Sequence, residues 1–212
     1  MSEQVLETKT PYLLYSGLLN TARMHYFRQV VKKSGLKPGS KLLDYGCGPG
    51  DMLLCAQELG IESFGIDNFE RSVSMAKERG LDVVLGDSSS MPYEKKSFDV
   101  IFSQSVLEHV PDAVKLVSEL KAYLKPGGTL IISTPTPGSH FWDDPTHVRP
   151  FTPKSFITLA DICGLRVLEV SYVFAFLLGL KLNNSIFYKI LNLLPFALGS
   201  NIIGFLKQNT ES

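Results

Sequence analysis

Apolar and polar positions along the chain follow a pattern that predicts strands and helices in turn. Short runs with the length of buried strands occupy 41–45, 62–66, 82–86, 98–103 and 129–133. Between several of these runs lie segments whose apolar residues have the spacing of a helix. One is the segment 111–124, which ends at Lys125-Pro126-Gly127-Gly128. This alternation predicts a doubly wound α/β domain, with helices on both faces of a mostly parallel sheet.

The two ends of the chain extend this order. Leu18, Ala22, Tyr26 and Val30 recur every four residues and predict a helix that runs to about Lys33.

After the fifth run, Thr152-Pro153 offers an N-cap and a proline at the first helical position, so we expect a helix to about Cys163. Strands at 166–172 and 201–207 complete a sheet of about seven strands, and we expect the last to be antiparallel.

Charge and cysteine content narrow the class of protein. The 212 residues contain 21 Lys and Arg against 21 Asp and Glu, a net charge of zero, which disfavours a nucleic-acid partner. Three cysteines without paired spacing predict reduced thiols. The polar first residues do not resemble a secretory signal, so we expect a cytoplasmic location.

A glycine-rich loop follows the first predicted strand, in the stretch Asp44-Tyr45-Gly46-Cys47-Gly48-Pro49-Gly50. Glycines there let the backbone approach a ligand closely. Asp51 stands where a dinucleotide fingerprint needs its third glycine, which disfavours NAD, and no Gly-Lys-Ser or Gly-Lys-Thr follows to hold a nucleoside triphosphate. A nucleoside cofactor without phosphates remains.

An acidic residue followed by G-x-G-x-G at this junction resembles the class I S-adenosylmethionine-dependent methyltransferases. Further similar motifs follow in the same order across residues 36–135: Gly65-Ile66-Asp67, Gly86-Asp87, Phe98-Asp99-Val100-Ile101 into Leu107-Glu108-His109-Val110, and Leu124-Lys125-Pro126-Gly127-Gly128. The family includes enzymes of ubiquinone biosynthesis and of sugar modification. The resemblance implies that S-adenosylmethionine is the cofactor and S-adenosylhomocysteine the product.

Asp67 is the strongest candidate for cofactor binding, because a carboxylate at the end of the second strand can accept hydrogen bonds from both ribose hydroxyls. The resemblance places Asp87 and Ser88 beside the adenine, Asp44 and Gly46 near the methionine moiety, and Ser103 with Gln104 along the other side. The remaining residues expected on the cofactor side are Cys47, Gly48, Gly50 and Asn68.

A general base is needed only if the acceptor carries a proton at neutral pH. His109, just past the fourth strand, and His147, in a segment that lines the acceptor side in similar enzymes, are the candidates. His140, Asp143, Asp144 and His147 have side chains that suit divalent ions, but loop residues of this kind are usually solvated, so we expect no metal site.

We divide the chain into a helical lid over residues 1–35, with Tyr12, Tyr15 or Arg28 facing the ligand, and a cofactor-binding domain over 36–212. This domain contains an acceptor-side loop at 136–152 and an apolar helical insert at 173–200. Asn183-Asn184, Lys189 and Pro195 interrupt the apolar run, which argues against a spanning helix.

The apolar residues from Val173 to Leu206 leave several roles open. They can form core helices, a lid over a lipid-like or quinone-like acceptor, a homodimer face, or a patch for peripheral membrane contact. Two functions remain: methyl transfer to a small-molecule or lipid-like acceptor, and non-catalytic binding of S-adenosylmethionine as a sensor or scaffold. The intact glycine loop favours cofactor binding under both.

Overall fold

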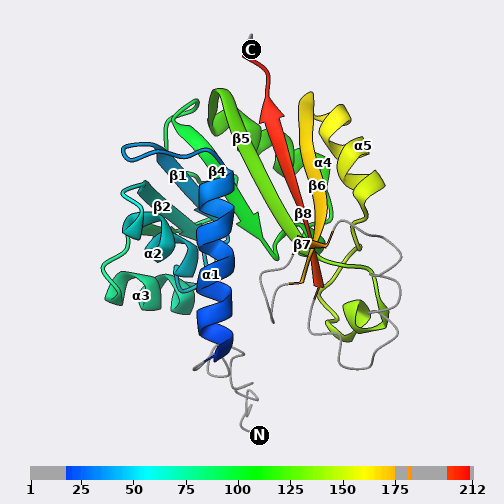
Figure 1. Ribbon diagram of the computed structural model, residues 1–212, viewed down its shortest axis with the longest axis horizontal. Coiled ribbons are helices and arrows are strands. Elements are labelled where there is room, and N and C mark those ends of the chain that lie inside the picture. The colour runs from blue at the N-terminus through cyan, green and yellow to red at the C-terminus, as the bar shows by residue number, and fades with distance from the viewer. Residues whose placement is uncertain (1–17, 175–180, 183–199, 211–212) are drawn as a thin grey trace, which may run out of the picture.

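The computed structural model describes residues 18–174, 181–182 and 200–210 (Figure 1). They form one sheet in the order β3-β2-β1-β4-β5-β8-β6-β7. The strands are β1 Lys41–Tyr45, β2 Glu62–Asp67, β3 Val83–Leu85, β4 Phe98–Gln104, β5 Leu124–Pro135, β6 Leu165–Phe174, β7 Lys181–Leu182 and β8 Ser200–Gln208.

Strands β1 to β5 pair in parallel, and β8 lies antiparallel between β5 and β6. The seven predicted strands and the antiparallel direction of the last one are therefore confirmed. The two-residue β7, paired with Tyr172 and Val173 at the sheet edge, is an addition to the prediction.

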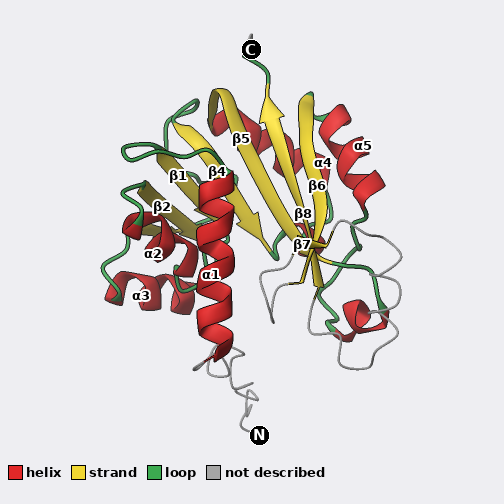
Figure 2. Cartoon of the chain, in the orientation of Figure 1, coloured by secondary structure: helices red, strands yellow, loops and turns green. Residues whose placement is uncertain are grey.

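The described residues contain five α-helices and two short 3-10 helices beside the sheet (Figure 2). They are α1 Leu18–Lys33, α2 Asp51–Glu58, α3 Glu70–Glu78, η2 Leu107–His109, α4 Ala113–Tyr123, η3 Ser139–Asp143 and α5 Pro153–Ile162. Thr152 and Ser155 form a capping box at the start of α5, with Pro153 in its first turn, which confirms the predicted helix start.

The sheet has a core on each face, because neighbouring strand residues point to opposite sides. Leu42, Val100 and Phe102 are buried in the cluster that contains the apolar residues of α1, α2 and α3. Leu43 and Ile101, one position along, belong to the cluster of α4 and α5. Helices on both faces are as predicted.

Most of the segment 173–200, expected as a helical insert, lies outside the described residues. Val173 and Phe174 continue β6, and Lys181–Leu182 are strand β7, so these residues are extended rather than helical. Within the described part of the chain, no helix has the length and apolar character needed to cross a membrane.

Strand order reverses at β1, because the chain runs outward through β2 and β3 and then returns to place β4 on the other side of β1. The crevice at the carboxyl ends of the strands beside such a reversal is where open α/β sheets bind ligands. The predicted glycine loop and Asp67 both lie at this end of the sheet.

Phe156 packs α5 against β8, and its substitution tests this contact. Its side chain is fully buried, and its ring lies so close to Gly204 that a Cβ on Gly204 would lie 2.7 Å from the ring. We expect Phe156→Ala to lower the free energy of unfolding by about 3–5 kcal/mol in urea denaturation. The neighbouring Ile157, 53% exposed, supplies the matched control. Ile157→Ala should change stability by less than about 0.5 kcal/mol, and equal losses for the two variants would contradict this packing.

Candidate functional site

A cavity of about 770 Å³ opens at the carboxyl ends of β1, β2 and β4. Its volume is within the range of small-molecule sites. The lining residues come from the loops that follow these strands and from the segment around residue 146: Tyr45, Gly46, Gly48, Ile66, Asp67, Asn68, Phe69, Gly86, Asp87, Gln104, Ser105, Val106, His109, Val110 and Thr146.

The glycine loop after β1 forms one wall of the cavity. Gly46, Gly48 and Gly50 all have positive φ, at 77°, 53° and 85°, a conformation that residues with a Cβ rarely adopt. A Cβ on Gly46 would also lie 2.3 Å from Cγ2 of Val106, and one on Gly50 would lie 2.2 Å from Cδ1 of Leu81. Gly46 is therefore required by the close approach of this loop to the segment after β4, and Gly50 by its approach to Leu81.

Asp67, at the end of β2, connects the two loops on its side of the cavity. Its Oδ2 accepts a hydrogen bond from the Gly48 backbone N–H at 2.8 Å, and its Oδ1 accepts one from the Phe69 N–H at 2.9 Å. Each carboxylate oxygen has a second acceptor position. The carboxylate can thus hold the loop and still accept hydrogen bonds from a ligand.

Asp87 lines the cavity after β3, and its Oδ1 accepts hydrogen bonds from the N–H and hydroxyl of Ser89. These bonds lower the pKa of the Asp87 carboxyl. Ser88 does not line the cavity, although its backbone N–H donates to the Tyr45 hydroxyl at 3.1 Å.

Several of the expected cofactor residues are not among those that line the cavity: Asp44, Cys47, Gly50, Ser88 and Ser103. Burial raises the pKa of the Cys47 thiol, which excludes a thiolate nucleophile at neutral pH.

The pKa of Asp44 is raised well above its ordinary value by burial and, second, by the charges of Asp67 and Asp51. Gln104 and Asn68, by contrast, line the cavity as expected.

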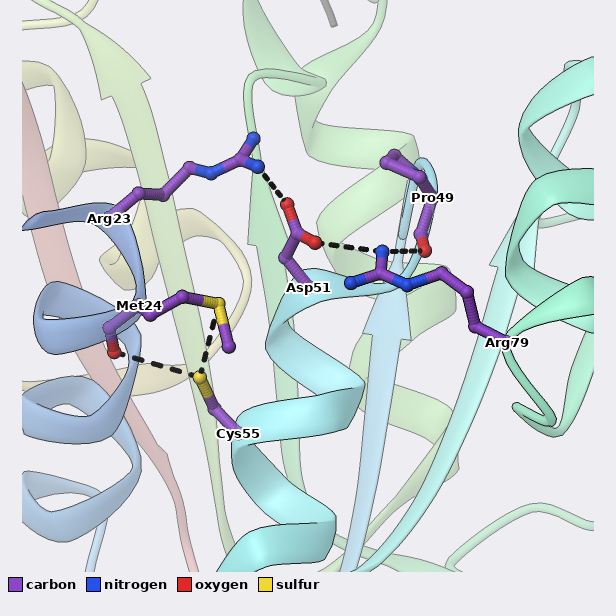
Figure 3. A network of polar contacts seen from close by, with 6 residues as sticks. All are labelled: Arg23, Met24, Pro49, Asp51, Cys55 and Arg79. Atoms are coloured by element: carbon purple, nitrogen blue, oxygen red, sulfur yellow. Dashed lines mark hydrogen bonds and ion pairs between the residues drawn. The ribbon is translucent and has the colours of Figure 1, made fainter. Parts of the chain in front are cut away.

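Asp51, the first residue of α2, is held by two arginines (Figure 3). One carboxylate oxygen forms an ion pair with Arg23 of α1, and the other accepts a hydrogen bond from Nη1 of Arg79 at 2.8 Å. The same Arg79 nitrogen donates to the Pro49 carbonyl at 2.5 Å. These contacts join α1, and Arg79 at the end of α3, to the end of the glycine loop.

The predicted lid role of the N-terminal segment receives no support from Arg28. Its guanidinium pairs with Glu58 of α2, with Nη2 2.7 Å from Oε2, because both side chains lie on the facing surfaces of α1 and α2. No described residue of α1 lines the cavity, and Tyr12 and Tyr15 lie outside the described residues.

The two candidate bases lie side by side. The ring centroids of His109 and His147 are 4.7 Å apart, and His109 lines the cavity. Nδ1 of His109 is 2.9 Å from the Thr146 hydroxyl, and Nδ1 of His147 is 2.6 Å from the Phe141 carbonyl. In both rings Nε2 is left to accept a proton or bind a cation.

Glu108 was not predicted as a site residue. Its side chain is fully buried, and burial raises its pKa to about 7. The Glu108 carbonyl accepts a hydrogen bond from the Val148 N–H at 2.7 Å, which brings the loop containing His147 against η2. The signal in the sequence is Leu107-Glu108-His109, an acidic residue next to a histidine shortly after a buried strand.

Of the four loop residues considered as a metal cluster, the structure brings Asp144 and His147 together, with Oδ2 and Nε2 3.8 Å apart. Asp143 is exposed, and the side chain of His140 lies outside what the structure describes.

Comparisons with known proteins find sequence similarity to methyltransferases. A family model described as a methyltransferase domain matches residues 43–132. Phosphoethanolamine N-methyltransferase 1 of Arabidopsis thaliana is 34% identical over 125 residues, which are 55% of this chain and 25% of that protein. The ubiquinone biosynthesis O-methyltransferase of Actinobacillus pleuropneumoniae is 34% identical over 128 residues, 55% of this chain and 53% of that protein. The chain thus spans between a quarter and about half of the length of these relatives.

Solved structures share the fold. A S-adenosylmethionine-dependent methyltransferase from Archaeoglobus fulgidus superposes with a TM-score of 0.66 at 23% identity, covering 94% of this chain and all of the other. Phosphoethanolamine N-methyltransferase 2 of Haemonchus contortus, in complex with phosphomonomethylethanolamine and S-adenosylhomocysteine, gives 0.68 at 19% identity, covering 88% and 53%.

Buried Asp44 should make stability fall as pH rises. Because its pKa is higher in the folded than in the unfolded chain, the folded state holds an extra proton between the two values. From about pH 4 upward, this group should lower the free energy of unfolding by up to about 1.4 kcal/mol per pH unit. Asp44→Asn should lose that dependence. Urea unfolding at pH 5, 6 and 7 measures this effect. A constant difference in the free energy of unfolding between the variant and wild type would contradict the prediction.

Proposed function

We propose that this chain is a class I, S-adenosylmethionine-dependent methyltransferase that transfers a methyl group to a small-molecule acceptor; the match of residues 43–132 to a methyltransferase domain supports the proposal. The observation that carries the proposal is the position of Asp67. Its carboxylate lines the cavity at the strand-order reversal and retains acceptor capacity while it holds the glycine loop.

The cofactor supplies an activated methyl group, so the chain needs mainly to orient the acceptor and exclude water. Asp67 would bind the ribose hydroxyls, with Asp87 and Asn68 farther along the same wall. His109, Val110 and Thr146, from the segments that follow β4 and β5, also line the cavity. The acceptor would enter there, beside the segment that follows β5.

The relatives suggest which acceptors to test first. Their names describe methyl transfer to phosphoethanolamine nitrogen and to an oxygen in ubiquinone biosynthesis. We propose polar amines and hydroxylated rings as the two acceptor classes for this chain. The lipid-like alternative stays a prediction, because most of the apolar segment that motivated it lies outside the described residues.

Ligand-induced stabilisation tests the cofactor. S-Adenosylhomocysteine at 100 times its dissociation constant should add about 2.7 kcal/mol to the free energy of unfolding and raise the melting temperature by several degrees. NAD and ATP at the same concentration should give no shift, because the glycine loop does not fit their phosphates. A larger shift with NAD would exclude the proposal.

Asp67→Ala should weaken S-adenosylhomocysteine binding at least about tenfold in calorimetric titration, since hydrogen bonds to charged groups contribute about 1.5–3 kcal/mol each. Exposed Asp82, in the loop before β3, is the matched control, and Asp82→Ala should bind as wild type does. Because Asp67 also holds two backbone N–H groups, circular dichroism must first show that the variant is folded. Unchanged affinity would remove Asp67 from the site. Binding without turnover on any acceptor would favour the sensor or scaffold alternative.

A further inference from the structure

Three side chains that commonly bind metals converge beside the cavity. One ligand atom each from Glu108, His109 and His147 lie within 4.8 Å of one another. We propose that these three residues bind a divalent metal ion. This replaces the sequence-based expectation of no metal site and gives the two histidines a role other than that of a general base.

The buried carboxylate of Glu108 is the first reason. The side chain is 0% exposed, and neither of its carboxylate oxygens has a hydrogen-bond partner in the described part of the chain. A buried polar group without a partner is costly, and a buried charge more so, unless a counter-charge or a cation compensates it. A bound cation would occupy both oxygens.

The hydrogen bonds of the histidines are the second reason. The Phe141 carbonyl can only accept, so Nδ1 of His147 carries the proton and donates it at 2.6 Å. The Thr146 hydroxyl donates to Asp144 Oδ1 at 2.6 Å and therefore accepts from Nδ1–H of His109. In the neutral form of each ring, Nε2 is then the nitrogen with a lone pair available for a metal, and Nδ1 donates to an oxygen, as it does in many metal-binding histidines.

The surrounding charge favours a cation. Oδ2 of Asp144 lies 3.8 Å from Nε2 of His147, so a second carboxylate borders the cluster. The hydrogen bond from the Val148 N–H to the Glu108 carbonyl holds the loop and η2 together and keeps the three ligands in one place.

Two imidazoles and one carboxylate are a ligand set typical of zinc and similar divalent ions, and three protein ligands leave at least one coordination position open. Because His109 and Thr146 line the cavity, the ion would lie at its acceptor side. Such a site is separate from the ribose-binding carboxylate of Asp67.

Zinc titration of chelator-treated protein tests the proposal without cofactor or acceptor. We expect one Zn²⁺ per chain by calorimetry, and Co²⁺ in its place should give visible absorption bands that report on the nitrogen and oxygen ligands. Glu108→Gln and His147→Gln should each lower Zn²⁺ affinity by more than about tenfold. Exposed His25 on α1 is the control, and His25→Gln should bind Zn²⁺ as wild type does.

Thr146→Val provides a variant that leaves the three ligands in place. Thr146 is exposed, so the change should not disturb the core, but it removes the oxygen that orients His109. We expect about a 10–100-fold loss of Zn²⁺ affinity. The proposal is overturned if wild-type protein binds no Zn²⁺, or if Glu108→Gln, His147→Gln and Thr146→Val, each shown to be folded by thermal unfolding, bind it as wild type does. S-Adenosylhomocysteine binding, measured on the same metal-free protein, shows separately whether the proposed cofactor site is intact.

Discussion

The carboxylate of Asp67 is the interaction on which the cavity depends. It accepts one backbone N–H from the glycine loop after β1 and one from the start of α3, and it thereby sets the distance between the two loops beside the strand-order reversal. Gly46 can approach Val106 only because it has no side chain. Gly46, Gly48 and Gly50 adopt positive φ because they lack a Cβ. The proposed ribose contact would therefore be made by the same side chain that holds this loop.

Asp44, Asp51 and Glu108 are buried carboxylic acids, and the groups around each of them differ. Asp51 is neutralised by Arg23 and Arg79, so the carboxylate that disfavours a pyrophosphate serves to join α1 to α2. Asp44 is buried near two other carboxylates, and its pKa rises accordingly. Glu108 is buried without a hydrogen-bond partner among the described residues. The ion pairs of Asp51 stabilise the fold, whereas buried Asp44 and Glu108 reduce its stability in the absence of a ligand, as is common at functional sites.

The order of strands and helices could be predicted from the sequence because its signals are local: helical spacing in 111–124, glycines after strands, and the Thr152-Pro153 cap. The helix after β4 begins at Ala113 rather than 111, since Asp112 caps it. Local signals also predicted Asp67 and His109 at strand ends, and the resemblance added Asp87; all three line the cavity. Such signals could not reveal that Arg28 pairs with Glu58, nor that the loop with His147 folds back on Glu108, because these contacts join residues 30 to 40 positions apart. Which of the expected residues line the cavity likewise depends on packing.

A crystal structure with S-adenosylhomocysteine would locate each part of the cofactor relative to the cavity. We expect the ribose hydroxyls within hydrogen-bond distance of the Asp67 carboxylate, the adenine beside Asp87, and the sulfur atom facing His109 and Thr146. A ligand bound elsewhere, or one whose ribose does not contact Asp67, would contradict the proposed role of Asp67.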